Sequence, residues 1–273
     1  MISMSGLSAS LALRLIGKTE DKEHEMIESE PQHAREIAYF MENIENVETV
    51  DDLIGDYRLY SFVMKAYDLE DQIFGKAMMG KILKSDIEED DALVNKLTDD
   101  RFEVFYEAMG FTDGGTSNSN TIDPEWKAKI VDAYVDTTYV NAKADDNEAL
   151  GLALQFRRKA ATVESAYDLL KDEDMAQFIR TALGLPDEIA SGDIDRQAAL
   201  LAERVDIDRL GDEDYVESLV SKFAAISDAN SDTVSTNSVV TLVSSAMSAS
   251  SGSFVPVTID IDTIQGFSGY KLR

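Results

Sequence analysis

The chain has no cysteine among its 273 residues, and it has only two histidines, His24 and His33. The lack of cysteine excludes disulfides, thiolate nucleophiles and cysteine-ligated zinc or iron–sulfur sites. With only two histidines, both near the start of the chain, most pairings of a nucleophile with a base cannot be built. We therefore expect a protein that is not an enzyme and that carries no metal or other cofactor.

Long apolar runs are also missing, because no stretch reaches the roughly 18 apolar residues that a membrane span needs. The apolar stretch at residues 11–16 is short and follows no basic segment, so we expect no cleaved signal peptide. Only 4 prolines and 15 glycines interrupt the chain, and its longest periodic apolar patterns have helical spacing. These features predict an all-α fold.

Basic residues are scarce: 25 lysines and arginines stand against 53 acids, which gives a net charge of −28. Such a charge repels nucleic acids and anionic lipid surfaces, so we expect neither as a partner. Two explanations remain open. The acids serve solubility or life in salt water, or they attract a basic protein partner.

An internal echo is the strongest pattern in the sequence. Residues 47–73 align without a gap on residues 163–189, at an offset of 116, and ten of these 27 positions are identical. Phe62 matches Phe178 within this alignment, and the shared apolar positions recur at helical spacing. The echo predicts two tandem related helical halves produced by an internal duplication.

Two acids mark helix starts within the echo. Asp56 and Asp172 precede apolar periodic segments and are good N-cap residues, so we predict helices over about residues 57–67 and 173–183.

Four segments follow from these patterns. Residues 1–112 form the first helical half and residues 124–227 the second. Residues 113–123, rich in glycine, serine, threonine and asparagine, read as a flexible linker. Residues 228–273 form a polar tail, rich in serine and threonine, with one predicted β-strand at residues 254–262.

The acids of "KAYDLEDQI" (residues 65–73) could hold a metal ion, but the echo argues against it. Asp68 faces Gly184 in the alignment, whereas Asp71 faces Asp187, which follows Pro186 in what reads as the first turn of a helix. Acids suit such positions because of the helix dipole. We expect Asp71 and Asp187 near helix starts, and no metal site.

Arg157 and Arg158 belong to "FRRK", the only compact basic run of the chain. At the end of a helix they suit the dipole. They serve either as an intramolecular hub of ion pairs or as a docking point for a partner.

The tail offers a second candidate surface. Its strand pattern alternates strictly, and its apolar face is formed by Val255, Val257, Ile259 and Ile261. A single strand needs a partner strand, in another protein or in a second copy, unless it covers the chain's own helical body or the tail has no ordered structure.

Several blocks in this order resemble domain-of-unknown-function family 1217. The blocks are "DYRLYSFVMKAYDLED", "NKLTDDRFEVFYEAMGF", "LALQFRRKA", "TALGLP" and "DIDRQAALLAERVDIDRL". The resemblance spans about residues 30–225. The family is common in alphaproteobacteria, where its genes are often found among flagellar genes, so the resemblance implies a link to the flagellum without implying an activity.

Three hypotheses about function follow. The first is a non-enzymatic, flagellum-associated structural or assembly protein. The second is an acidic cytoplasmic adaptor or chaperone for a basic partner. The third is a metal-dependent hydrolase. They leave the localisation open between the cytoplasm and export to the flagellum.

Overall fold

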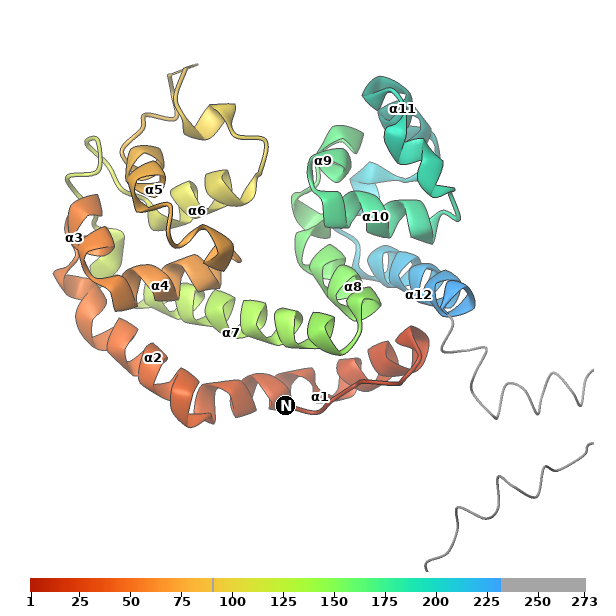
Figure 1. Ribbon diagram of the computed structural model, residues 1–273, viewed down its shortest axis with the longest axis horizontal. Helices are drawn as coiled ribbons and strands as arrows, with labels where there is room; N and C mark the ends of the chain where they lie inside the picture. The colour runs from red at the N-terminus through yellow and green to blue at the C-terminus, as the bar shows by residue number, and fades with distance from the viewer. Residues whose placement is uncertain (90, 232–273) are drawn as a thin grey trace, which may run out of the picture. The chain divides into compact units, whose positions relative to one another are not determined.

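The computed structural model describes residues 1–89 and 91–231, and these residues form an all-helical structure, as predicted (Figure 1). The α-helices of this part are α1 (Ala9–Ser29), α2 (Pro31–Asn43), α3 (Val50–Gly55), α4 (Tyr57–Ala66), α5 (Lys76–Leu83), α6 (Arg101–Met109), α7 (Pro124–Asp146), α8 (Glu148–Lys159), α9 (Ala166–Lys171), α10 (Glu173–Ala182), α11 (Ile194–Arg204) and α12 (Glu213–Asn230). The 3₁₀ turns are η1 (Ile44–Asn46), η2 (Glu70–Gln72), η3 (Val94–Lys96), η4 (Asn120–Ile122), η5 (Ala160–Thr162), η6 (Asp187–Ser191) and η7 (Ile207–Arg209). The predicted strand at residues 254–262 lies outside the described residues.

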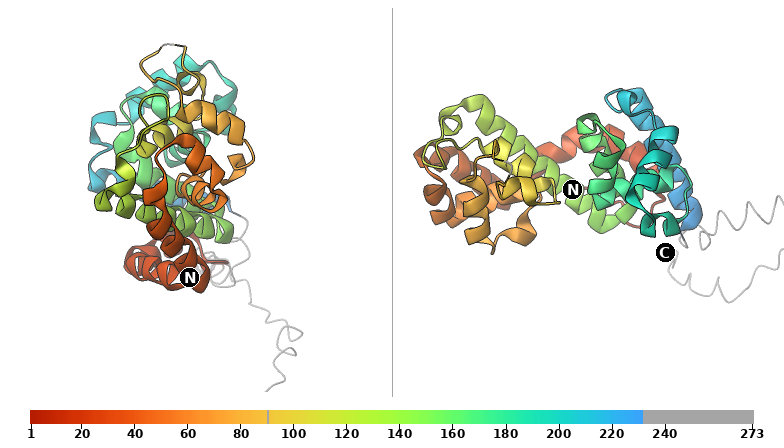
Figure 2. Two further views of the ribbon diagram at one scale, coloured as in Figure 1. Left: turned by 90° about the vertical axis from the view of Figure 1, so that its left-hand side faces the viewer. Right: turned by 90° about the horizontal axis from the view of Figure 1, so that it is seen from above.

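Residues Met1–Asn230 form one compact unit with two groups of helices. Helices α2 to α6 make one group, and helices α8 to α12 make the other. The long helix α7 runs from one group to the other (Figure 2), and α1 packs against α7 and against α8 and α12 of the second group. Within the described residues, no helix combines the length and apolar content that a bilayer crossing requires.

Side-chain caps start the matched helices where the sequence predicts them. The carboxylate of Asp56 accepts hydrogen bonds from the first-turn backbone N–H groups of α4, and Asp172 does the same for α10. A capping box begins the helix before each of these. It joins Thr49 to Asp52 at α3 and Ser165 to Asp168 at α9. The predicted helices over 57–67 and 173–183 are confirmed to within one residue.

The core of each group contains a stack of three aromatic rings. One stack is Phe40, Phe62 and Tyr134, and the other is Phe156, Phe178 and Phe223. The ring centroid of Phe62 lies 4.6 Å and 4.2 Å from its two neighbours, and that of Phe178 lies 3.9 Å and 4.5 Å from its own. Both central phenylalanines are buried.

Helix bounds recur at the offset of the sequence echo. The turns η1 and η5, the helices α3 and α9, and the helices α4 and α10 begin and end 116 residues apart. These equal bounds are what an internal duplication requires, and the duplication itself stays a prediction.

Residues 113–123, predicted as a flexible linker, make specific contacts with the first helix group. The backbone N–H of Val50 donates to the carbonyl of Gly115 over 2.9 Å. The hydroxyl of Thr121, which is buried, donates to the carbonyl of Val47 over 3.2 Å. The boundaries of the predicted segments stay a prediction.

The first residues of the chain are held by a buried ion pair between α1 and α7. Glu23 and Lys143 are 0% and 1% exposed at their side chains, and their charged atoms lie 2.7 Å apart. The backbone N–H of Ile2 donates to Glu23, and Lys143 donates to the carbonyl of Ile2. Two residues later, the backbone N–H of Met4 donates to Asp146 over 2.6 Å. Charged residues thus anchor a segment that lacks secondary structure.

The last described helix closes the unit against the first one. Asp228 of α12 accepts hydrogen bonds from the backbone N–H groups of Ala9 and Ser10, over 2.6 Å and 3.1 Å. These N–H groups belong to the first turn of α1, where intrahelical partners are missing. The two ends of the unit therefore support each other.

Candidate binding cleft between the two helix groups

Two joined cavities lie between the helix groups. The larger one, the acidic compartment, has a volume of about 360 Å³ and is lined mainly by charged residues between the start of α6 and the start of α10. The smaller one, the apolar compartment, has a volume of about 240 Å³, and Ala66, Tyr67, Val104 and Ala133 contribute to its lining. Both cavities are bordered by Asp68, Asp100, Arg101 and Lys159. We call the pair the cleft.

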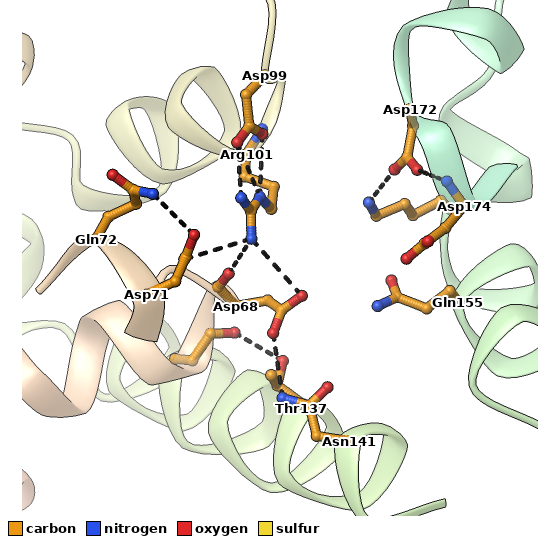
Figure 3. Close-up of polar contacts among 12 residues, drawn as sticks. Asp68, Asp71, Gln72, Asp99, Arg101, Thr137, Asn141, Gln155, Asp172 and Asp174 are labelled. Atoms are coloured by element: carbon orange, nitrogen blue, oxygen red, sulfur yellow. Dashed lines mark hydrogen bonds and ion pairs between the residues drawn. The ribbon is translucent and has the colours of Figure 1, made fainter. Parts of the chain in front are cut away.

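Arg101 organises the wall that the first helix group contributes (Figure 3). Its guanidinium donates to both carboxylate oxygens of Asp99, and the closest contact is 2.7 Å. It also lies 4.0 Å from the carboxylate of Asp68 and 3.7 Å from that of Asp71, and it donates to the carbonyl of Asp68. The acids of "KAYDLEDQI" thus serve partly to hold an arginine.

The pKa of Asp99 reflects this arrangement. Burial acts to raise it, but hydrogen bonds from the side chain and backbone of Arg101 outweigh burial and hold the pKa below its usual value. Asp99 therefore stays ionised and remains paired with Arg101.

Lys159 and Asp172 form the opposite wall, at the end of α8 and the start of α10. The Lys159 ammonium donates to one carboxylate oxygen of Asp172, and the other oxygen caps α10. Desolvation at this wall, with Asp172 next to it, raises the pKa of Asp174. The ionised form of Asp174 is therefore incompletely compensated by its surroundings.

Helix α7 forms the floor of the cleft (Figure 3). Asn141 donates to the carboxylate of Asp68 over 3.1 Å, and the Thr137 hydroxyl donates to the carbonyl of Ala66 over 3.0 Å. These bonds join the first helix group to the helix that also carries the second.

Three carboxylates of the acidic compartment have no cationic partner among the described residues. Asp100, Glu173 and Asp174 form no ion pair with another described residue. The cations of the same compartment are already paired: Arg101 with Asp99, Asp68 and Asp71, Lys159 with Asp172, and Lys171 with Asp168. The lining of this compartment therefore carries a net negative charge.

The two arginines predicted as an interaction site form intramolecular ion pairs. Arg157 forms two hydrogen bonds with Glu217 of α12, one of them 2.7 Å long. Arg158 donates to Asp136 over 3.1 Å and to Thr137 over 3.0 Å, and it borders the apolar compartment. These pairs match the predicted intramolecular hub, and Arg158 also lies where a ligand of the cleft would reach it. The other predicted interaction residues, Val255, Val257, Ile259 and Ile261, lie outside the described residues.

Both histidines lie away from the cleft lining. Nδ1 of His33 lies 2.8 Å from the hydroxyl of Tyr134, and the ring of His24 packs edge-on against Tyr139, with centroids 4.8 Å apart. Among residues 1–89 and 91–231, no group of three or more histidines and acids is arranged to hold a metal ion.

Sequence reasoning missed most of the cleft, although a signal for it was available. Part of the lining falls where the two halves differ at matched positions: Asp68 faces Gly184, and Arg101 faces Asp214. Other lining residues, such as Asp99 and Asp172, are the same in both halves. Matched positions such as Phe62 and Phe178 are buried in the core instead.

Comparisons with known proteins agree with the resemblance seen in the sequence. A family described as "Protein of unknown function (DUF1217)" matches residues 66–216, a span that contains the whole lining of the cleft. A crystal structure of an Agrobacterium tumefaciens protein, determined as a structural genomics target, is 33% identical and has a TM-score of 0.73. The similarity covers 83% of this chain and 95% of that one. No curated protein matches this chain. The chain belongs to the DUF1217 family.

Proposed function

We propose that this chain is a non-enzymatic, flagellum-associated structural or assembly protein that binds a basic protein partner in the cleft. One observation carries the choice of partner. Asp100, Glu173 and Asp174 line a concave site, and the cations beside them are already paired within the chain. A ligand that brings its own cations would pair with these acids.

Long-range electrostatics support the same class of partner. The net charge of −28 accelerates the approach of a positively charged protein and slows that of nucleic acids. A cleft concentrates this field, because its walls exclude part of the solvent.

The chemistry of the cleft supports binding rather than catalysis. Its two arginines and two lysines are paired with carboxylates, and the histidines contact Tyr134 and Tyr139 elsewhere. General acid–base catalysis needs a group whose pKa is poised near the working pH and that reaches the substrate. The carboxylate of Asp99, which Arg101 keeps ionised, does not meet this requirement. Asp174 has a raised pKa, but no histidine lines the cleft to act with it.

The flagellar part of the proposal rests on the link to the flagellum that the resemblance to this family implies. The alternative is a cytoplasmic adaptor or chaperone, and the acidic cleft favours it equally, because a chaperone would hold the same basic partner before assembly. The two differ in where the protein is found.

Charge-neutral variants in the native host test this proposal. Glu173→Gln with Asp174→Asn removes two cleft charges from the first turn of α10. Glu213→Gln with Asp214→Asn removes the same two residue types from the first turn of α12, outside the cleft. Both pairs follow a capping aspartate with the same bonding pattern, Asp172 or Asp212.

We expect the cleft variant to reduce swimming motility and the α12 variant to leave it unchanged. Recovery of the wild-type protein in the flagellar fraction supports a structural role, and recovery only in the cytoplasm, with a bound flagellar protein, supports the adaptor. Equal motility of both variants and the wild type contradicts a role for the cleft.

A further inference from the structure

Gln155 is a buried polar side chain that faces the acidic compartment. It lies on α8, is 8% exposed, and points its amide into the space between the helix groups (Figure 3). Its carbonyl oxygen accepts one long hydrogen bond, of 3.4 Å, from Arg158. Its amide nitrogen has no hydrogen-bond partner among the described residues. The side chain as a whole is buried, but the amide nitrogen opens into the compartment, so it is free to donate to a group that arrives from outside.

The group that satisfies this amide must be a neutral acceptor. A cation cannot accept a hydrogen bond, and an anion would be repelled by Asp100, Glu173 and Asp174. The carbonyl oxygen of a peptide bond fits both conditions. A peptide that places a carbonyl at Gln155 could send a lysine or arginine side chain to the neighbouring carboxylates.

The apolar compartment adds a second requirement. Val104 is 51% exposed at its edge, and Ala66, Tyr67 and Ala133 contribute apolar surface. Because Asp100 and Arg101 border both compartments, one short segment can reach both. An apolar side chain next to a basic one would remove this surface from water.

We infer that the cleft recognises an extended peptide segment in which lysine or arginine stands beside an apolar residue, with Gln155 as the donor to its backbone. This inference rests on the proposed function and specifies its ligand. Recognition of a backbone carbonyl separates such a segment from polyamines, which carry the positive charge but no acceptor of this kind.

Fluorescence polarisation with purified full-length chain and synthetic peptides tests the ligand class. The probe is a labelled peptide that alternates arginine and leucine. The controls are the same peptide with serine for leucine, the same peptide with citrulline for arginine, and spermidine as a competitor. We expect saturable binding of the probe that weakens as salt is added, and binding about tenfold weaker for each control peptide. Equal binding of the probe and the serine peptide, or full displacement by micromolar spermidine, overturns the inference.

A variant at Gln155 tests the backbone contact. Gln155→Met keeps the length of the side chain and removes its donor, so we expect about tenfold weaker binding of the probe. The folded chain should lose little thermal stability, because the amide nitrogen has no partner to lose and the side-chain oxygen accepts only the long, 3.4 Å bond from Arg158. Gln177→Met on α10, outside the cleft lining, is the control and should leave binding unchanged. Unchanged binding by Gln155→Met contradicts the assigned role, and the peptide comparison on the wild-type chain does not depend on how the variant folds.

The two proposals fail in different ways. If the probe does not bind while Glu173→Gln with Asp174→Asn still abolishes motility, the ligand class is wrong and the binding function stands. If neither effect is seen, both are wrong.

Discussion

Asp68 and Gly184 occupy matched positions 116 residues apart, and both have a positive φ, 55° and 63° respectively. Each follows the end of a helix, and the backbone N–H of the next residue closes the turn. Leu69 donates to the carbonyl of Met64 over 2.8 Å, and Leu185 donates to the carbonyl of Arg180 over 2.9 Å. Glycine adopts this conformation freely, whereas aspartate is strained in it. The strained residue is the one whose side chain enters the cleft.

Replacing Asp68 with glycine should therefore separate stability from function. Relief of the positive φ contributes about 1 kcal/mol. Loss of the partly exposed, 4.0 Å contact with Arg101 and of the exposed hydrogen bond from Asn141 costs up to about 1 kcal/mol together. We expect urea unfolding to show a free energy that is unchanged or higher by up to about 1 kcal/mol, together with weaker partner binding. A clear loss of stability would show that Asp68 serves the fold.

The aromatic stacks should carry much of the stability of each helix group. Phe62→Ala and Phe178→Ala each remove the central ring of a stack, so each should lower the free energy of unfolding by about 3–5 kcal/mol. Phe74→Ala is the control, because Phe74 is 93% exposed, and it should change stability by less than about 0.5 kcal/mol. Losses under about 1 kcal/mol for the two core variants would mean that the rings do not hold the groups together.

The buried pair of Glu23 and Lys143 should be sensitive to the loss of either partner. Lys143→Met leaves Glu23 charged and buried, so we expect a loss of about 3–5 kcal/mol in the free energy of unfolding. Adding Glu23→Gln should restore much of that loss, because no uncompensated charge then remains. A single variant as stable as the wild type, measured by urea unfolding, would show that water reaches this site.

The pH dependence of this pair has a defined sign. Burial acts to raise the pKa of Glu23, but hydrogen bonds from Lys143 and from the backbone of Ile2 hold it below its usual value. The stabilisation by Glu23 is therefore complete above the usual glutamate range and is lost as the pH falls through its lowered pKa. Acid titration of the wild type and of the double variant Glu23→Gln with Lys143→Met should show that the wild type alone loses this contribution.

Because the pKa of Asp174 is raised, its ionisation should destabilise the folded chain, whereas ionisation of Glu23 stabilises it. The neutral form of Asp174 is favoured in the folded chain, so ionisation at pH 7 costs stability. Asp174→Asn should raise the Tm at pH 7, and the gain should vanish below about pH 3, where both side chains are neutral. Asp214→Asn removes an acid from the matching turn of α12 and corrects for the loss of a favourable helix-dipole contact. A lower Tm for Asp174→Asn than for Asp214→Asn at pH 7 would mean that Asp174 is paired.

Helix positions were predictable where their signals are local. The starts of α4 and α10 depend on Asp56 and Asp172, which cap the turn directly after them, and the prediction was within one residue at their ends. At residues 91–97, by contrast, only the short turn η3 is helical. There the side chain of Asn95 bonds to the carbonyls of Ile87 and Glu89, which favours a compact loop.

The cleft could not be predicted in this way, because its walls come from distant parts of the chain. Arg101 meets Asp68 only when α6 packs beside the end of α4, and Gln155 reaches the same space from α8. For Arg157, the sequence left open whether it pairs within the chain or with a partner. Its bond to Glu217 spans 60 residues, and only the fold brings the two together.

The most direct test of a partner in the cleft is photo-crosslinking in living cells. A photoreactive amino acid replaces Val104 at the edge of the cleft or, as a control, Ile194 on α11; these positions are 51% and 55% exposed. We predict that the derivative at Val104 gives a discrete adduct with a protein whose crosslinked segment carries a basic residue beside an apolar one. This adduct should disappear with Glu173→Gln and Asp174→Asn, and the derivative at Ile194 should not form it. The same adducts from both positions, or an adduct that survives loss of the two cleft charges, would contradict the account.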